Sequence, residues 1–159
     1  MRRDTSYIEV TLHLSDKNGQ KKVKRFDIIE HTADVGITAY GANLKEAFAN
    51  AAYAMFTLIA DLENVREDVR RHIEVQAEDR ESLLVSWLNE LLYIFDVERT
   101  IFKRFEVTEL RETSLKAEGY GELLDQSRHG LRGGLKAATY HMLKIEKNDG
   151  YSVRVIFDT

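Results

Sequence analysis

The segment FDIIEHTADVGITAYG, residues 26–41, decides how the rest of the chain is interpreted. Apolar residues of the kind that form β-strands run up to Ile29 and resume at Val35. Between them, residues 30–34 bring a carboxylate, an imidazole, a hydroxyl and a second carboxylate. A connection between strands needs only to turn. The segment therefore predicts two strands whose connection carries candidate functional groups, although a turn with one stray acid fits the same residues.

A further strand is predicted upstream of this segment. Residues 7–14, YIEVTLHL, alternate between apolar and polar side chains, which is typical of a half-buried strand, and Asn18-Gly19 favours a turn after it. Residues 1–25 hold seven basic and three acidic residues, a formal charge of +4 in a chain whose total is −4. We interpret residues 1–25 as a basic N-terminal extension, a β-hairpin strand joined to a domain that spans residues 26–159. A solvated hairpin is favoured over an arm that binds RNA or a partner.

Two helices are predicted downstream. Asn43 can cap the first helix, Glu46 lies three residues further on as in a capping box, and apolar residues then recur at helical spacing to Ala60. The second helix is predicted over residues 80–96 and carries a wide apolar stripe. We expect this stripe to pack against a sheet as core, in preference to forming an exposed partner groove. Its members are Leu83, Leu84, Trp87, Leu88, Leu91, Leu92 and Phe95.

The predicted fold class is α+β, with the two helices packed on a mostly antiparallel sheet. A glycine-rich loop, QSRHGLRGG, carries Arg128, His129 and Arg132. Such a loop could wrap an anion through its backbone N–H groups, but an ordinary mobile hairpin is favoured. The remaining strands are expected at residues 69–77, 101–110, 114–121, 136–146 and 151–157.

Composition excludes several classes of function. Hydrophobic residues make up 43% and charged residues 31% of the 159, the balance of a soluble globular domain. Without cysteine there is no disulfide, thiolate metal site or cysteine nucleophile, and a cytoplasmic location is expected. The N-terminus lacks the apolar segment of a signal peptide, and no apolar run is long enough to span a membrane. The acidic body argues against a DNA-binding surface, which needs many lysines and arginines.

The last residues, VRVIFDT, predict an alternating strand that delivers Asp158 and Thr159. The side chain of Asp158 and the α-carboxylate of Thr159 are two negative groups one residue apart. With a third carboxylate, they would form the kind of oxygen site that Ca²⁺, Mg²⁺ and Mn²⁺ prefer. Spacing alone leaves solvated terminal acids as the simpler interpretation. In the strand expected before them, Tyr140 and His141 would face opposite sides.

Several segments together resemble the archease family. EHTADVGITAYG and NLKEAFANAA are followed, in the family's order, by LLVSWLNELLYIFD, by Gly121-Glu122, by LKAATYH and by the terminal FDT. The resemblance covers residues 26–159, and HTAD and KAATYH are distinctive in combination. The chain departs from the family in beginning earlier and in ending Asp-Thr, where the family commonly ends Asp-Ile. If the last residue supplies only main-chain oxygens, threonine serves as well as isoleucine.

The resemblance implies an archease-like fold and a protein that activates an RtcB-type tRNA-splicing RNA ligase without being an enzyme. It would promote guanylylation and multiple turnover of the ligase and associate with tRNA only indirectly. It also implies a divalent-metal site formed by Asp34, Asp158 and Thr159, with Ca²⁺ favoured and Mn²⁺ or Mg²⁺ as alternatives. Three further residues are candidates for supporting this site or contacting the partner: His31, Lys136 and His141. For His31, which could orient Asp34 or fill the core, the structural role is favoured.

Two alternative functions remain at this point. A metal-dependent phosphoryl-transfer enzyme could use the same carboxylates, but the sequence contains no P-loop and no evident general acid–base pair. A chaperone-like or RNA-processing adaptor would need an exposed apolar patch, which the closely patterned helices do not indicate.

Overall fold

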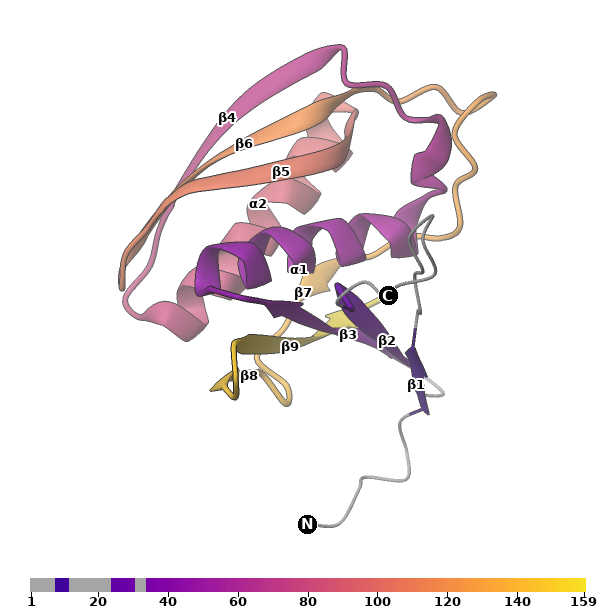
Figure 1. Ribbon diagram of the computed structural model, residues 1–159. Helices are drawn as coiled ribbons and strands as arrows, with labels where there is room; N and C mark the ends of the chain where they lie inside the picture. Colours follow the sequence, from indigo (N-terminus) through magenta and orange to yellow (C-terminus); the bar gives the residue numbers. More distant parts are fainter. Residues whose placement is uncertain (1–7, 12–23, 31–33) are drawn as a thin grey trace, which may run out of the picture.

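The computed structural model describes residues 8–11, 24–30 and 34–159 and has three layers (Figure 1). Two antiparallel sheets form the outer layers, and both helices lie between them. The first sheet has the order β1-β2-β3-β9-β7, with β8 also paired to β9, and the second sheet has the order β4-β6-β5. The α+β class is thus confirmed, but the single expected sheet is divided into two.

The bounds of the elements agree with the prediction over most of the chain. In the first sheet the strands are β1 (Ile8–Thr11), β2 (Phe26–Glu30), β3 (Val35–Gly41), β7 (Ala137–Ala138), β8 (Lys144–Lys147) and β9 (Tyr151–Asp158). In the second sheet they are β4 (Val69–Gln76), β5 (Thr100–Leu110) and β6 (Ser114–Leu123). The helices are α1 (Leu44–Ile59), α2 (Arg80–Glu98) and the short 3-10 helix η1 (Leu62–Asn64), which the sequence did not predict.

Helix α1 is buried on more than one side because it packs against β3 of the first sheet and β5 of the second. Its small residues allow both sheets to approach closely. Asn43 caps the helix as predicted, accepting a hydrogen bond from the Glu46 N–H at 2.9 Å. The residues of α1 with no exposed surface are Ala47, Phe48, Ala51, Ala52, Ala54, Met55 and Phe56.

Helix α2 contributes its apolar stripe to the core, as predicted. It begins with a reciprocal capping box, in which the Ser82 N–H donates to Asp79 Oδ1 at 2.8 Å and the Asp79 N–H donates to Ser82 Oγ at 3.1 Å. The stripe is buried up to Leu92, and Phe95 is half-buried against the core. The helix ends at Arg99, which has a φ of 53°.

The prediction of a single strand over residues 136–146 is wrong. The chain forms β7 over two residues, turns, and resumes as β8. The turn includes Met142, which adopts a left-handed φ of 55°. Tyr140 and His141 therefore lie in the turn, and the argument that they face opposite sides of a strand does not apply.

The N-terminal part of the chain is described only in part. β1 pairs antiparallel with β2, so residues 8–11 extend the first sheet. The predicted turn at Asn18-Gly19 lies outside the described residues, as does His31. The expected division of the chain at residue 25 stays a prediction.

Candidate functional site

The register of β3 and β9 brings Asp34 and Asp158 towards each other. These strands pair antiparallel, and the last pair of the ladder is Val35 opposite Phe157. Continued by one step, the same register would set Asp34 opposite Asp158. Residues directly opposite in an antiparallel pair share a face and have Cβ atoms about 5 Å apart. Asp34 and the end of the chain would thus meet at one end of the first sheet.

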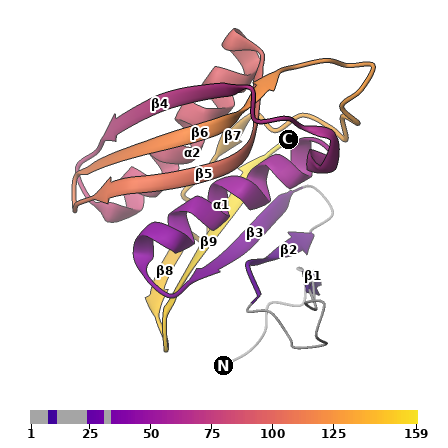
Figure 2. The same ribbon diagram turned by 45° about the horizontal axis from the view of Figure 1, so that its top comes forward.

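The other side of Asp158 is held by β7. Ala137 pairs with Asp158, and the Lys136 N–H donates to the Asp158 carbonyl at 2.8 Å. Asp34 is half-buried, whereas Asp158 and Thr159 are exposed. Figure 2 shows the end of the chain next to β7. The main chain of Asp158 is therefore held by β7, whereas the residue remains exposed to solvent.

Of the three supporting candidates, two can be placed. Lys136 is exposed, and its main chain holds the Asp158 carbonyl. His141 is exposed in the turn after β7, where its N–H donates to Thr139 Oγ1 at 3.3 Å. The Thr139 hydroxyl in turn donates to the Ile156 carbonyl at 2.8 Å. The backbone of His141 therefore lies near the last residues of β9. A role of its side chain in supporting the site or contacting the partner stays a prediction.

The donors at this end of the sheet suit a hard cation. Carboxylate oxygens are ligands that Ca²⁺, Mg²⁺ and Mn²⁺ accept, and the Asp158 main-chain carbonyl is already engaged by Lys136. Within the described ranges, no three side chains of His, Asp or Glu come together as a metal cluster. A third negative donor beside Asp34 and Asp158 would accordingly be the α-carboxylate of Thr159. Asp34 and Asp158 are thus donors of the kind such an ion takes, and the site itself stays a prediction.

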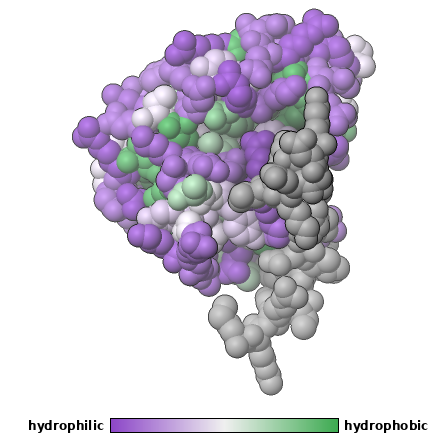
Figure 3. Space-filling view, viewed as in Figure 1, coloured by the Kyte–Doolittle hydropathy of each residue, from purple (hydrophilic) through white to green (hydrophobic). Residues whose placement is uncertain are grey.

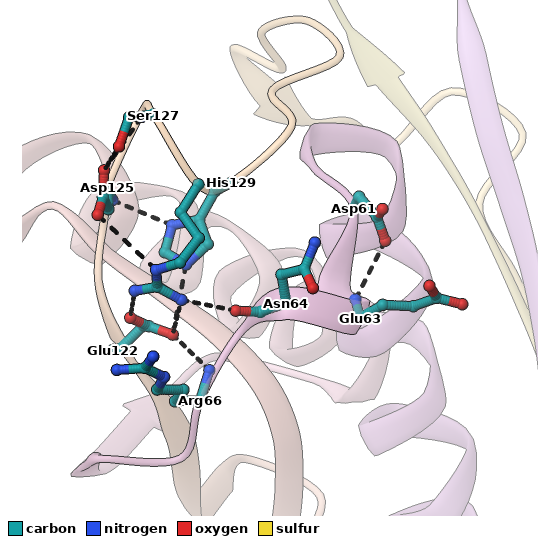
Figure 4. A network of polar contacts seen from close by, with 9 residues as sticks. Asp61, Glu63, Asn64, Arg66, Glu122, Asp125, Ser127 and His129 are labelled. Atoms are coloured by element: carbon teal, nitrogen blue, oxygen red, sulfur yellow. Dashed lines mark hydrogen bonds and ion pairs between the residues drawn. The ribbon is translucent and has the colours of Figure 1, made fainter.

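A second polar cluster lies next to the glycine-rich loop, at the C-terminal end of β6 (Figure 4). Glu122 is 6% exposed and forms a bidentate ion pair with Arg128. It also accepts the N–H of Arg66, and the Arg128 guanidinium donates to the Asn64 carbonyl at 2.7 Å. The Arg128 hydrogen bond is the main reason that the pKa of Glu122 falls from 4.5 to about 2, against the opposing effect of burial.

His129 fills the space beside this pair and is 1% exposed. The Asp125 N–H donates to His129 Nδ1 at 3.0 Å, so the ring proton belongs on Nε2, which lies 3.3 Å from Glu122 Oε2. Glu122 belongs to the Gly121-Glu122 segment of the family resemblance, but the sequence alone assigned it no role. The signal that could have found it is a lone acid at the end of a strand, shortly before two arginines.

The glycine-rich loop is fastened to the end of α1. The Asp61 N–H donates to the Gly130 carbonyl at 3.0 Å, and the Arg132 N–H donates to the Ile59 carbonyl at 2.8 Å. The Arg132 guanidinium donates to the Thr57 carbonyl at 2.8 Å. Both arginines of the loop are thus engaged within the protein. The loop acts as a structural strap between β6 and α1, which weakens the anion-binding interpretation.

Comparison with known families agrees with this architecture. The sequence model of the archease protein family matches residues 26–159. The chain belongs to the archease family. The archease of Methanosarcina acetivorans is 43% identical over 140 residues, covering 85% of this chain and 96% of that protein. The archease of Pyrococcus abyssi is 46% identical over 129 residues, covering 79% and 90%.

A solved structure of the same fold supports the assignment. The solution structure of Methanobacterium thermoautotrophicum protein 1598 superposes with a TM-score of 0.73 at 38% sequence identity. The match covers 85% of this chain and 99% of that one. Among the described residues of this archease, neither helix is long and apolar enough to cross a membrane.

Proposed function

We propose that this archease is an accessory protein that activates an RtcB-type tRNA-splicing RNA ligase. It would promote guanylylation of the ligase and allow multiple turnover, associating with tRNA through the ligase. The observation that supports the proposal is the register of β3 and β9, which ends with Val35 opposite Phe157 and, continued by one step, would set Asp34 opposite Asp158 in a member of this family. These acids are the residues that the family resemblance assigns to a metal site.

The proposed cation site consists of the side chains of Asp34 and Asp158 and the α-carboxylate of Thr159. Three negative groups at one place repel one another and favour a counter-cation. Ca²⁺ is the favoured ion, with Mn²⁺ and Mg²⁺ as alternatives, since all three bind oxygen donors. When bound, the ion would neutralise these carboxylates and present a positive centre to the ligase. Lys136 would keep Asp158 in place through its N–H, and Lys136 and His141 would flank the contact surface.

The adaptor alternative has less support from the molecular surface. The face shown in Figure 3 is mainly hydrophilic, with small hydrophobic areas between larger polar ones. A chaperone-like adaptor would be expected to display a contiguous apolar patch. The large apolar side chains that are exposed among the described residues are Tyr93, Val97, Leu123, Leu131 and Tyr140.

The decisive experiment combines the protein with its cognate ligase, GTP and Mn²⁺ and follows guanylylated ligase and ligated RNA over many turnovers. Stimulation is expected at substoichiometric amounts, and Asp34→Asn and Asp158→Asn are expected to abolish most of it. Glu67→Gln, which changes an exposed acid in the segment just before β4, serves as the matched control. Absence of stimulation by the wild-type protein would reject the activator role. Hydrolysis of nucleotide or RNA by the protein alone would favour the phosphoryl-transfer enzyme.

The metal site is tested separately by calorimetric titration with Ca²⁺, Mn²⁺ and Mg²⁺. The wild-type protein is expected to bind one ion per chain, and Asp34→Ala is expected to weaken binding strongly. An unchanged affinity in Asp34→Ala would remove Asp34 from the site. This titration does not need the ligase, so it distinguishes failure of the cation site from failure of the activator role.

A further inference from the structure

Helix α2 holds the edge of the first sheet through the side chain of Asn89. The Ala138 N–H donates to Asn89 Oδ1 at 2.7 Å, and Asn89 Nδ2 donates to the Ala138 carbonyl at 3.3 Å. One side-chain amide thus satisfies both main-chain groups of a single residue in β7. This is the pattern that a neighbouring strand would offer, since an amide side chain carries the same donor and acceptor as a peptide group.

The need for this contact follows from the position of β7. β7 is the last strand of its sheet and pairs with β9 over only two residues. Ala138 is 5% exposed, so its outward N–H and carbonyl would lie away from water without a partner. Leaving a buried peptide group without a hydrogen bond costs free energy, so a strand of two residues would not be stable in this position by itself. Asn89 removes this cost and fixes β7 to α2.

The anchor itself is well placed to hold a strand rigidly. Asn89 follows Trp87 and Leu88 and precedes Leu91, all with no exposed surface, in the middle of α2. The Trp87 indole N–H also donates to the Phe48 carbonyl of α1 at 3.0 Å. Because the core holds α2 on both sides of Asn89, the backbone that carries the amide is fixed in place.

We infer that Asn89 is a positioning residue for the carboxylate pair at the chain terminus. The path has three contacts: Asn89 holds Ala138, β7 pairs with the end of β9, and the Lys136 N–H holds the Asp158 carbonyl. The inference rests on the cation site of the proposed function. It adds that the geometry of the site depends on a residue of α2 that does not touch the ion.

The test compares Asn89→Ala with Asn50→Ala. Asn50 is a buried asparagine of α1 whose Nδ2 donates to the Tyr40 carbonyl at 2.6 Å, a helix-to-strand contact of the same kind. Tyr40 lies six residues along β3 from Asp34, roughly 20 Å away. Both variants should lower the stability to urea. Asn89→Ala alone should weaken Mn²⁺ binding, by about tenfold or more, the usual effect of losing a residue that orients a metal ligand.

Hydrogen exchange of the Lys136 amide is the second readout. This N–H reports directly whether β7 still holds Asp158, and it should exchange faster in Asn89→Ala but not in Asn50→Ala. Wild-type exchange and wild-type affinity in Asn89→Ala would overturn the inference, as would equal loss of affinity in both variants. If the wild-type protein binds no ion, the cation site of the proposed function fails, while the exchange rates still decide whether Asn89 positions Asp158.

A conservative variant covers the case in which Asn89→Ala does not fold. Asn89→Asp keeps the shape of the side chain and the acceptor for the Ala138 N–H, but it cannot donate to the Ala138 carbonyl. Its extra negative charge would by itself favour a cation, so weaker Mn²⁺ binding would have to come from displacement of β7. We expect weaker binding and faster exchange of the Lys136 amide, and wild-type values of both would overturn the inference.

Discussion

Glu122 is a nearly buried carboxylate that the surrounding donors keep ionised. Replacing it by glutamine would remove the closer of two carboxylates paired with the Arg128 guanidinium, the other being Asp125 at 3.7 Å, and would weaken the hydrogen bond from the Arg66 N–H. We expect Glu122→Gln to lower the free energy of unfolding by on the order of 2 kcal/mol, less than for a fully buried pair because Arg128 is partly solvated. Urea titration measures this. Glu67→Gln, at an exposed pair with Arg104, should change stability far less, and equal effects would contradict this role of Glu122.

The same residue makes stability depend on acidity. The folded-state pKa of Glu122 is about 2, below its ordinary value of 4.5, so the unfolded chain binds the proton more tightly. The stability from this pair is therefore fully present above about pH 4.5 and is lost as the pH falls towards 2. Unfolding followed across this window should show a smaller acid-induced loss in Glu122→Gln than in the wild type. Identical pH profiles would mean that the carboxylate is not preferentially ionised in the folded state.

His72, on the outer face of the second sheet, makes stability depend on pH in the opposite direction. Its ring lies between two carboxylates, with Nε2 3.0 Å from Glu74 and Nδ1 2.8 Å from Glu118, and these hydrogen bonds raise its pKa above 6.5. Only the protonated ring can donate to both. Its contribution to stability is thus present below pH 6.5 and lost as the pH rises through the folded-state pKa. An NMR titration of the ring should give a midpoint above 6.5 that falls in Glu74→Gln, and an unshifted midpoint would refute the bridge.

Individual residues also mark the limit of what the sequence could predict. The Asn43 cap followed from local spacing, because a cap and its partner lie three residues apart. The pairing of Asp34 with Asp158 needs β3 and β9 to be neighbours, which local pattern does not specify and only the family resemblance suggested. Asn89 was hidden inside an apolar helical pattern. Its role depends on which strand happens to face α2.

At the scale of elements, α1 shows what a position between two sheets requires. Ala51 has no exposed surface, whereas Ala49 on the same helix is half-buried. A leucine at position 51 would have to displace neighbouring core residues, so we expect Ala51→Leu to destabilise the protein by about 2 kcal/mol, measured by urea unfolding. Ala49→Leu should cost clearly less. Tolerance of leucine at position 51 would contradict packing on both sides of the helix.

The strands illustrate which elements periodicity can and cannot predict. Long alternating segments such as β5, β6 and β9 were predicted to within a few residues because one face of each is buried. The break between β7 and β8 was missed because residues 136–146 contain no glycine, proline or asparagine. Met142 adopts the left-handed conformation there without any local signal. The division into two sheets was likewise missed, since alternation shows that a strand is half-buried and not which strands pair.

At the scale of the whole molecule, the fold joins two parts of the chain that are more than a hundred residues apart. β3 and β9 run antiparallel in the middle of the first sheet, so the start of one lies beside the end of the other. The proposed site therefore exists only in the folded chain. Asp34 directly precedes β3, whereas the other donors come from Asp158, the last residue of β9, and from Thr159 after it. A change confined to the exposed Thr159 should therefore weaken cation binding without disturbing the core.

A short extension after Thr159 tests this arrangement. Adding Gly-Ser-Gly converts the α-carboxylate of Thr159 into an amide carbonyl and moves the terminal charge away from Asp34 and Asp158. Because Thr159 is exposed and lies after the last strand, the free energy of unfolding should stay close to wild type. The affinity for Mn²⁺, by contrast, should fall about tenfold or more, as should stimulation of the ligase, because one of three negative donors is lost. The same extension placed before Met1 serves as the control and should leave the affinity unchanged. If the C-terminal extension also leaves it unchanged, then the terminal carboxylate is not a ligand, and Asp34 and Asp158 must hold the ion with some other donor.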